Sequence, residues 1–305
     1  MLEPKKSRVL WKWGGWRIGL GGLVFGLAAN LTSALEISGQ IFSSAANFPL
    51  AEVTILVEGE QVAKTDTEGR FYLTDLQKNQ LVRFQKEAYI DFSTFASKDS
   101  ENWEIELAPI WSISDFTKVY LDIKQAIWFE EAVRFLYERQ VWQERKPTYF
   151  LPQELVTRGE LIQLSVRAGG FLPPAIQQTS FCDVEVGRNF AAALELAFTQ
   201  NWIKGFIKQD CQKQRIFKPQ NYVTRAEALK IIFEALGDLL AVRLKNKTCL
   251  APGLKDVPTE AWFAKYVTQA SCLGLVKGYP DGTFRPKREL NRAELALILA
   301  KALDF

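Results

Sequence analysis

Three blocks of sequence recur in this chain at an equal interval. They read FLPQELVTRGE, FKPQNYVTRAE and FRPKRELNRAE, and they begin at Phe150, Phe217 and Phe284. Each block has Pro two positions after its Phe, Arg eight positions after it and Glu ten positions after it. A long period seen three times indicates one supersecondary unit in three copies, not a single large core. Function should therefore be sought in this repeat.

A second shared element lies upstream of each block. It is an Asp followed by Ile or Val, and six positions after the Asp comes Trp in the first and third copies and Asn in the second. These positions are Asp122 and Trp128, Asp183 and Asn189, and Asp256 and Trp262. The second copy is longer than the other two because it carries six extra residues between Gly205 and Phe217.

The amino terminus has the pattern of an export signal. Cations precede an apolar run at 18–29, and Thr32, Ser33 and Ala34 follow it as small residues. This order is typical of a secretory signal peptide, so we expect residues 1–34 to be removed after Ala34. The alternative is an uncleaved membrane anchor at 14–34, which is just long enough to span but contains Arg17 and Asn30.

All four cysteines lie within the repeats. Export would place them in an oxidising compartment, where disulfides form. Three connectivities are open, and we favour Cys182 with Cys211 and Cys249 with Cys272 because each pair stays within one copy. Four free buried thiols are the alternative.

Composition excludes several function classes. The chain contains no histidine and no closely spaced cysteine pair, so Ser-His-Asp and Cys-His catalysis and the usual zinc sites are excluded, and we expect no metal and no cofactor. A net charge of +3 is too small to indicate a nucleic-acid partner. The sequence therefore favours a protein that is not an enzyme.

Residues 35–110 have the pattern of short strands. Val53, Ile55 and Val57 alternate with other residues, and the segment 65–69, TDTEG, supplies turn chemistry. With the following Arg70 and Phe71, this segment resembles the carboxypeptidase regulatory-like, transthyretin-like domain family. The resemblance implies a β-sandwich that acts as a spacer or contact surface without an active site. We read Asp66 and Gly69 as turn residues only.

The repeated arginines are the least expected feature of the blocks. Thr157, Thr224 and Asn291 each stand three positions before a Glu, which predicts a capping box at a helix start. The Arg that follows each cap would then oppose the helix dipole, at a cost of about 0.3 to 1 kcal/mol. A carboxylate or phosphate bound at the helix start is one explanation, and an internal salt bridge is the other.

The third copy is similar to the S-layer homology domain family. The residues that carry the resemblance are GYPDGTFRP at 278–286, with Arg292 and Glu294, and with Asp256 and Trp262 upstream. In that family three copies form one pseudo-threefold body, in which each copy gives a helix to a central bundle. Grooves between copies bind cell-wall polysaccharide, commonly with acidic ketals. The resemblance implies that the groove positions are the early Asp, the Trp, the Gly before the loop and the Arg.

These positions carry over unequally to the three copies. The third copy keeps all four of them, the second has Asn at the Trp position, and the first has Glu144 at the Gly position. The candidate polysaccharide-binding residues are Asp256, Trp262, Gly278 and Arg292, then Asp183, Gly205 and Arg225, then Asp122, Trp128 and Arg158. The set in the third copy is expected to form the principal groove. Trp would offer a flat face to a sugar, Asp would accept hydroxyl hydrogen bonds, and Arg would pair with the acid.

Together these patterns predict a multidomain chain, with a small all-β sandwich followed by an all-α module of three repeats in a pseudo-threefold helical bundle. The expected boundaries are 1–34 for the signal, 35–110 for the sandwich, and 112–170, 171–237 and 238–305 for the first, second and third copies. The expected function is non-covalent anchoring of a secreted cell-envelope protein to cell-wall polysaccharide or peptidoglycan. Two alternatives are a membrane-to-wall tether through an uncleaved anchor, and an accessory subunit whose sandwich docks an envelope enzyme.

Overall fold

The computed structural model describes residues 34–44, 48–96, 102–110, 119–123, 127–142, 149–209, 211 and 215–305. The export signal or anchor expected at 1–34 lies almost entirely outside these residues, and so does Glu144. The described part of the chain has no helix that is both long and apolar enough to cross a membrane.

Two sheets form the amino-terminal part. One has the order β4 (Arg70–Leu76), β1 (Leu35–Ser43), β7 (Asn102–Leu107), and the other has the order β3 (Glu60–Lys64), β2 (Thr54–Val57), β5 (Leu81–Gln85), β6 (Phe92–Phe95). Strand β1 is antiparallel to β4 and parallel to β7. Alternate apolar residues of both sheets enclose one core, and Ile41, Ile55 and Phe84 are fully buried there. We call residues 34–110 the two-sheet unit.

The turn before β4 explains the TDTEG segment. The carboxylate of Asp66 accepts hydrogen bonds from the backbone N–H groups of Glu68 and Arg70. Gly69 has φ +72°, and a Cβ on it would lie 2.6 Å from the carbonyl oxygen of Ile41. Both residues therefore serve the turn, as the sequence predicted.

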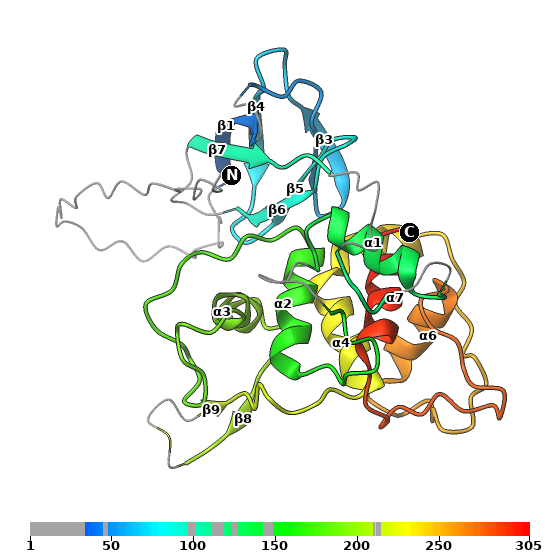
Figure 1. The fold of residues 1–305 in the computed structure, drawn as a ribbon. Coiled ribbons are helices and arrows are strands. Elements are labelled where there is room, and N and C mark those ends of the chain that lie inside the picture. Colours follow the sequence, from blue (N-terminus) through cyan, green and yellow to red (C-terminus); the bar gives the residue numbers. More distant parts are fainter. Residues whose placement is uncertain are drawn as a thin grey trace, which may run out of the picture. The chain divides into compact units, whose positions relative to one another are not determined.

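The repeat region is built mainly from pairs of helices. The first helices of the three copies are α1 (Glu130–Glu138), α3 (Ala191–Thr199) and α6 (Ala264–Cys272), and the second helices are α2 (Arg158–Ala168), α4 (Arg225–Ala235) and α7 (Arg292–Ala302). Each second helix begins at a repeated Arg, with Thr157, Thr224 or Asn291 as its N-cap. Figure 1 labels these paired helices. A further helix, α5 (Gly237–Leu244), begins where the second copy ends.

The expectation of an all-α repeat region was wrong. The extra residues of the second copy form a hairpin of β8 (Phe206–Ile207) and β9 (Arg215–Ile216). Isolated bridges also join Leu155 to Asn291, Thr157 to Tyr222, and Thr224 to Glu289. The physical reason is that the residues before each second helix are extended, and their backbone groups pair with the corresponding extended segment of another copy.

These extended segments close a ring. The N–H of Val223 donates to the carbonyl of Val156, the N–H of Leu290 donates to Val223, and the N–H of Val156 donates to Leu290. The helices follow the same order, since α3 packs on α2, α6 packs on α4, and α1 of the first copy packs on α7 of the third. The first helix of each copy thus packs on the second helix of the copy before it, and that of the first copy packs on the second helix of the third.

The two-sheet unit contacts the repeat region directly. Arg83 on β5 donates two hydrogen bonds to the carboxylate of Asp238 on α5, at 3.0 and 2.9 Å. Their side chains are 4% and 5% exposed. Beside this pair, the ring of Phe95 on β6 stacks on Phe171 with centroids 5.4 Å apart. A buried bidentate pair and a stacked ring pair give this contact a fixed geometry.

Candidate functional site

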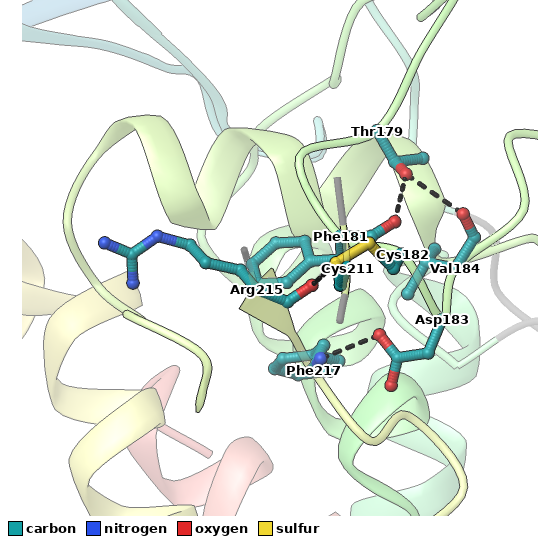
Figure 2. Close-up of a disulfide and its surroundings, with 8 residues drawn as sticks. All are labelled: Thr179, Phe181, Cys182, Asp183, Val184, Cys211, Arg215 and Phe217. Atoms are coloured by element: carbon teal, nitrogen blue, oxygen red, sulfur yellow. Dashed lines mark hydrogen bonds between the residues drawn. A yellow bond between two sulfur atoms is a disulfide. The ribbon is translucent and has the colours of Figure 1, made fainter. Parts of the chain in front are cut away.

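The early Asp of each copy holds the start of the following block. Each carboxylate accepts two backbone N–H groups, those of the block's Phe and of the residue after it, at distances between 2.6 and 2.8 Å. The acceptors are Asp122 for the first copy, Asp183 for the second and Asp256 for the third. Figure 2 shows this for Asp183 and Phe217. Since both oxygens of each Asp already bind backbone, these residues position the loop.

The repeated arginines form ion pairs from copy to copy. The Nη1 of Arg158 lies 3.6 Å from Oε1 of Glu227, and that of Arg225 lies 4.0 Å from Oε1 of Glu294. The third pair returns to the first copy, because Nη1 of Arg292 lies 2.6 Å from Oε1 of Glu160. The arginine side chains are only 9 to 11% exposed. The internal salt bridge, the second explanation left open by the sequence, is therefore present in all three copies.

Two aromatic rings enclose each of these guanidinium groups. The ring centroids lie 4.6 to 5.4 Å from the guanidinium carbon, within the range of cation–π contact. The ring pairs are Phe206 and Phe217 around Arg158, Tyr279 and Phe284 around Arg225, and Trp142 and Phe150 around Arg292. Burial lowers the pKa of Arg158 and Arg225, although neighbouring acidic groups oppose this shift. Two rings and one carboxylate therefore hold each guanidinium group in place.

One groove gathers candidate residues from all three copies. Trp128 of the first copy, Arg225 of the second and Gly278 of the third line a space of about 400 Å³. The other lining residues are Leu275, Val276, Lys277, Tyr279, Glu294, Leu297, Ile298 and Lys301. We call this space the Trp128 groove. Three of its lining side chains are cations and one is a carboxylate, so it favours an anionic ligand.

The four candidates of the third copy do not meet in this groove. Gly278 lines it, but Trp262 and Arg292 are not among the lining residues. Arg292 lies instead beside Trp142 and Phe150 of the first copy. The positions named by the resemblance come together from neighbouring copies, because each repeated Arg lies against the following copy and not against its own.

The two tryptophans at the shared position are displayed in the same way. Trp128 is 58% exposed and Trp262 is 55% exposed. Each meets the following Phe edge to face, with centroids 5.2 Å apart for Trp128 and Phe129 and 5.4 Å apart for Trp262 and Phe263. Each ring is therefore braced on one edge and open to solvent on much of its surface. Asn189, at the same position in the second copy, is exposed.

Tyr279 and the lysines of the groove were missed from sequence. Tyr279 follows Gly278 directly, and its ring lies 4.0 Å from the guanidinium carbon of Arg285. The turn behind it is fixed by Asp281, which accepts hydrogen bonds from Thr283 and from Arg285. These bonds lower the pKa of Asp281 to about 2. The aromatic residue directly after the loop glycine, present again as Phe206 after Gly205, was the signal that could have found this position.

Both glycines of the loops lie in close contacts, and Gly205 also has a backbone conformation that favours glycine. A Cβ on Gly278 would lie 2.4 Å from Cδ2 of Leu254. Gly205 has φ +68°, and a Cβ on it would lie 2.9 Å from the carbonyl oxygen of Ile216. They shape the loops that carry Tyr279 and Phe206.

The two disulfides predicted from sequence are both present. Cys182 pairs with Cys211 across a Cα–Cα distance of 6.1 Å, and Cys249 pairs with Cys272 across 5.4 Å. The first joins the β8–β9 hairpin to the residue before Asp183, as Figure 2 shows. Among the described residues, no three His, Cys, Asp or Glu side chains are grouped so as to hold a metal ion.

Parts of this chain are similar in sequence to known proteins. The S-layer homology domain model matches residues 120–162 and 253–296, which are parts of the first and third copies. A cellulosome-anchoring protein of Acetivibrio thermocellus is 43% identical over 89 residues, covering 29% of this chain and 19% of that protein. An amylopullulanase of Thermoanaerobacterium thermosulfurigenes is 27% identical over 190 residues, covering 62% of this chain and 10% of the enzyme.

A third relative is the outer membrane protein SlpA of Deinococcus radiodurans, which is 43% identical over 53 residues, covering 17% of this chain and 4% of that protein. The matches span less than a fifth of the length of each of these three relatives. The chain therefore carries two segments that match the S-layer homology domain, and it is similar over parts of its length to anchoring and cell-surface proteins.

Proposed function

We propose that this chain is a non-catalytic protein of the cell envelope that attaches to cell-wall polysaccharide or peptidoglycan through its repeat region. The observation that carries the proposal is the Trp128 groove, to which all three copies contribute. We further propose that residues 171–237 are a divergent S-layer homology repeat and that residues 35–110 are a carboxypeptidase regulatory-like domain.

The lining of the groove supports an acidic sugar as ligand. Trp128 offers a half-exposed aromatic face of the kind on which a sugar ring stacks, and apolar Leu275 and Ile298 lie in the same groove. Arg225, Lys277 and Lys301 supply positive charge. Glu294 supplies the opposing carboxylate, but it already pairs with Arg225 and Arg288. A carboxylate on the sugar would therefore meet a net positive surface.

The ion pairs change the role that we assign to the arginines. Arg225 keeps contact with the groove and is also fixed by Glu294, so it acts as a preorganised cation. Arg158 and Arg292 are held in the same manner by Glu227 and Glu160. We propose that Lys277 and Lys301 add the more exposed, less constrained charges of the groove.

The two disulfides support an extracytoplasmic location. Disulfides persist in oxidising compartments, and both bridges lie in the repeat region. We propose that the protein is secreted and associated with the wall, in the periplasm or at the cell surface. Some relatives that carry such repeats are enzymes by name, and we propose that this chain shares their anchoring module and not their chemistry.

Sedimentation with purified wall sacculi tests this function. Trp128→Ala is expected to reduce the bound fraction, because it removes the exposed ring without emptying a buried core. Tyr72→Ala is the matched control, because Tyr72 is 57% exposed and lies on β4 of the two-sheet unit. Sacculi stripped of secondary polysaccharide by acid should bind less of the unchanged protein if that polymer is the ligand. Equal binding of both variants and the unchanged protein would refute the groove assignment.

A further inference from the structure

The Trp128 groove lies where α1 of the first copy packs on α7 of the third. The ring repeats this arrangement, because α6 of the third copy likewise packs on α4 of the second (Figure 1). Trp262 comes directly before the N-cap of α6, as Trp128 comes directly before the N-cap of α1. The two tryptophans are 55% and 58% exposed, so exposure alone gives both the same access to a sugar. The side chains around them are different.

Tyr266 fills the space beside Trp262. It stands four residues after the tryptophan, where the first copy has Ala132. Its side chain is buried, with its ring centroid 6.0 Å from that of Phe233 on α4. Its hydroxyl donates a hydrogen bond of 2.7 Å to Oε1 of Glu234, also on α4. A large side chain thus joins α6 to α4 at the position that is a small alanine between α1 and α7.

Glu234 reverses the charge of one position of the Trp128 groove. It stands nine residues after the repeated Arg225, and Lys301 stands nine residues after the repeated Arg292. Lys301 lines the groove, whereas the carboxylate of Glu234 accepts the hydrogen bond from Tyr266. An acidic sugar next to Trp262 would therefore meet a carboxylate where the Trp128 groove offers a cation, and like charges brought together cost free energy.

Lys230 adds a third difference on the same face of α4. It stands five residues after the repeated Arg, where α7 has Leu297, one of the residues that line the Trp128 groove. Its Nζ donates a hydrogen bond of 3.4 Å to the carbonyl oxygen of Trp202, so the side chain reaches from α4 to the loop that precedes Gly205. Three positions that are Ala, Leu and Lys at the open groove are thus Tyr, Lys and Glu here.

We propose that Tyr266 and Glu234 exclude the wall polymer from Trp262, so that the repeat region selects Trp128 as its binding tryptophan. This assignment rests on the function proposed above, and it names the residues that decide which tryptophan is used. A sugar that stacked on Trp262 and entered between α6 and α4 would have to displace a buried ring and break its hydrogen bond. At the remaining position of the ring, where α3 packs on α2, Asn189 replaces the tryptophan.

The two tryptophans are matched variants of each other in a sedimentation assay of the full chain with purified wall sacculi. Trp128→Ala should weaken binding roughly tenfold, because it removes the aromatic face on which the sugar is buried. Trp262→Ala should change binding by less than about twofold, as a surface substitution outside the site does. Equal losses from the two variants, or a larger loss from Trp262→Ala, would overturn the proposal.

Opening the space beside Trp262 gives a second test. In the Trp128→Ala chain, Tyr266→Ala together with Glu234→Lys supplies the alanine and the lysine of the open groove, and this should recover most of the lost binding. Adding Trp262→Ala should remove the recovered binding. Tyr266→Phe is the control, because it keeps the ring in the space and should recover nothing. Thermal unfolding followed by circular dichroism verifies that each variant is folded.

No recovery in a folded variant would overturn the role of Tyr266, as would recovery that persists without Trp262. If the combined variant does not fold, the two single tryptophan variants decide the question. Sacculi that bind none of the unchanged protein would refute the proposed function and this choice of tryptophan with it. Binding that falls equally in both single variants would refute the choice alone.

Discussion

Arg292 at the start of α7 lies 2.6 Å from Glu160 at the start of α2, so an ion pair joins the last copy to the first. The two residues are 132 positions apart in sequence. The corresponding pairs of Arg158 with Glu227 and of Arg225 with Glu294 join the successive copies. The same three arginines that the sequence suggested as ligands for a wall polymer thus connect the copies to one another.

Loss of the closing ion pair should destabilise the repeat region. Glu160→Gln removes the charged partner of Arg292, whose side chain is 10% exposed, and should lower the free energy of unfolding by about 2 kcal/mol. Urea titration followed by circular dichroism measures this. Glu185→Gln is the control, because Glu185 and its partner Arg188 are largely exposed. Equal midpoints for the two variants would contradict a structural role for the pair.

A fragment that lacks the third copy should not fold. In a chain ending at Gly237, Val156 loses the carbonyl of Leu290, Arg292 is absent, and α1 loses its packing against α7. We expect little helical signal and no cooperative transition from residues 112–237. A stable fragment with a sharp thermal transition would show that each copy closes its own core.

The buried pair of Arg83 and Asp238 should couple the unfolding of the two-sheet unit to that of the repeats. Asp238→Asn removes the carboxylate that accepts both hydrogen bonds of the buried Arg83 guanidinium and leaves the carboxylate of Asp91 3.9 Å away, so we expect a loss of about 2 kcal/mol at this contact. Calorimetry should then resolve two transitions where the unchanged protein shows one. Lys245→Gln serves as the control, because its pair with Glu60 is exposed. Two transitions already present in the unchanged protein would refute the coupling.

The Asp281 turn should respond to acid in a defined window. Hydrogen bonds from Thr283 and Arg285 lower the pKa of Asp281 from 3.8 to about 2, so its ionised form is favoured in the folded state. The contribution of these hydrogen bonds to folding stability is fully present above the ordinary Asp pKa of 3.8, and it is lost as pH falls through the folded-state pKa of about 2. Carboxyl chemical shifts followed by NMR should give that midpoint, and Arg285→Ala should move it upward. An unshifted midpoint in both proteins would remove the proposed origin of the shift.

Removal of the Cys182–Cys211 disulfide should destabilise the second copy. Replacing Cys182 and Cys211 together by Ser should lower the free energy of unfolding by about 2 to 4 kcal/mol. The readouts are the denaturant midpoint and the exchange rates of amides in 203–218. The Cys249 and Cys272 double variant is the comparison, because it removes a bridge of similar span from the third copy. Unchanged hairpin exchange in the first variant would show that the strand pairs alone hold the hairpin.

The sequence predicted local features well because their causes are local. The caps at Thr224 and Asn291 rest on a Glu three residues away, and the turn at Asp66 rests on Gly69. The two disulfides followed from the position of each cysteine pair within a copy. In each case both partners lie within one copy or one turn, so the sequence of that copy or turn carries the information.

The set of residues that line the Trp128 groove could not be predicted from the sequence. Trp128, Arg225 and Gly278 meet only because the copies close into a ring, and no spacing within one copy states which neighbour an Arg will face. The hairpin was also missed, because β8 and β9 have two residues each and six of the seven residues between them are polar. The extended segments before the second helices likewise pair across copies, which is why an all-α region was expected and not found.

The closed order of the copies also limits how such a module can change in evolution. A stack of repeats with open ends can gain or lose a unit, since a new unit meets the same neighbour surface. Here the amide of Val156 already takes the carbonyl of Leu290, so a fourth copy would have to break that contact and widen the whole ring. A closed ring of this kind therefore resists a change in copy number more than a change in loop length, and the six extra residues between Gly205 and Phe217 lie in such a loop.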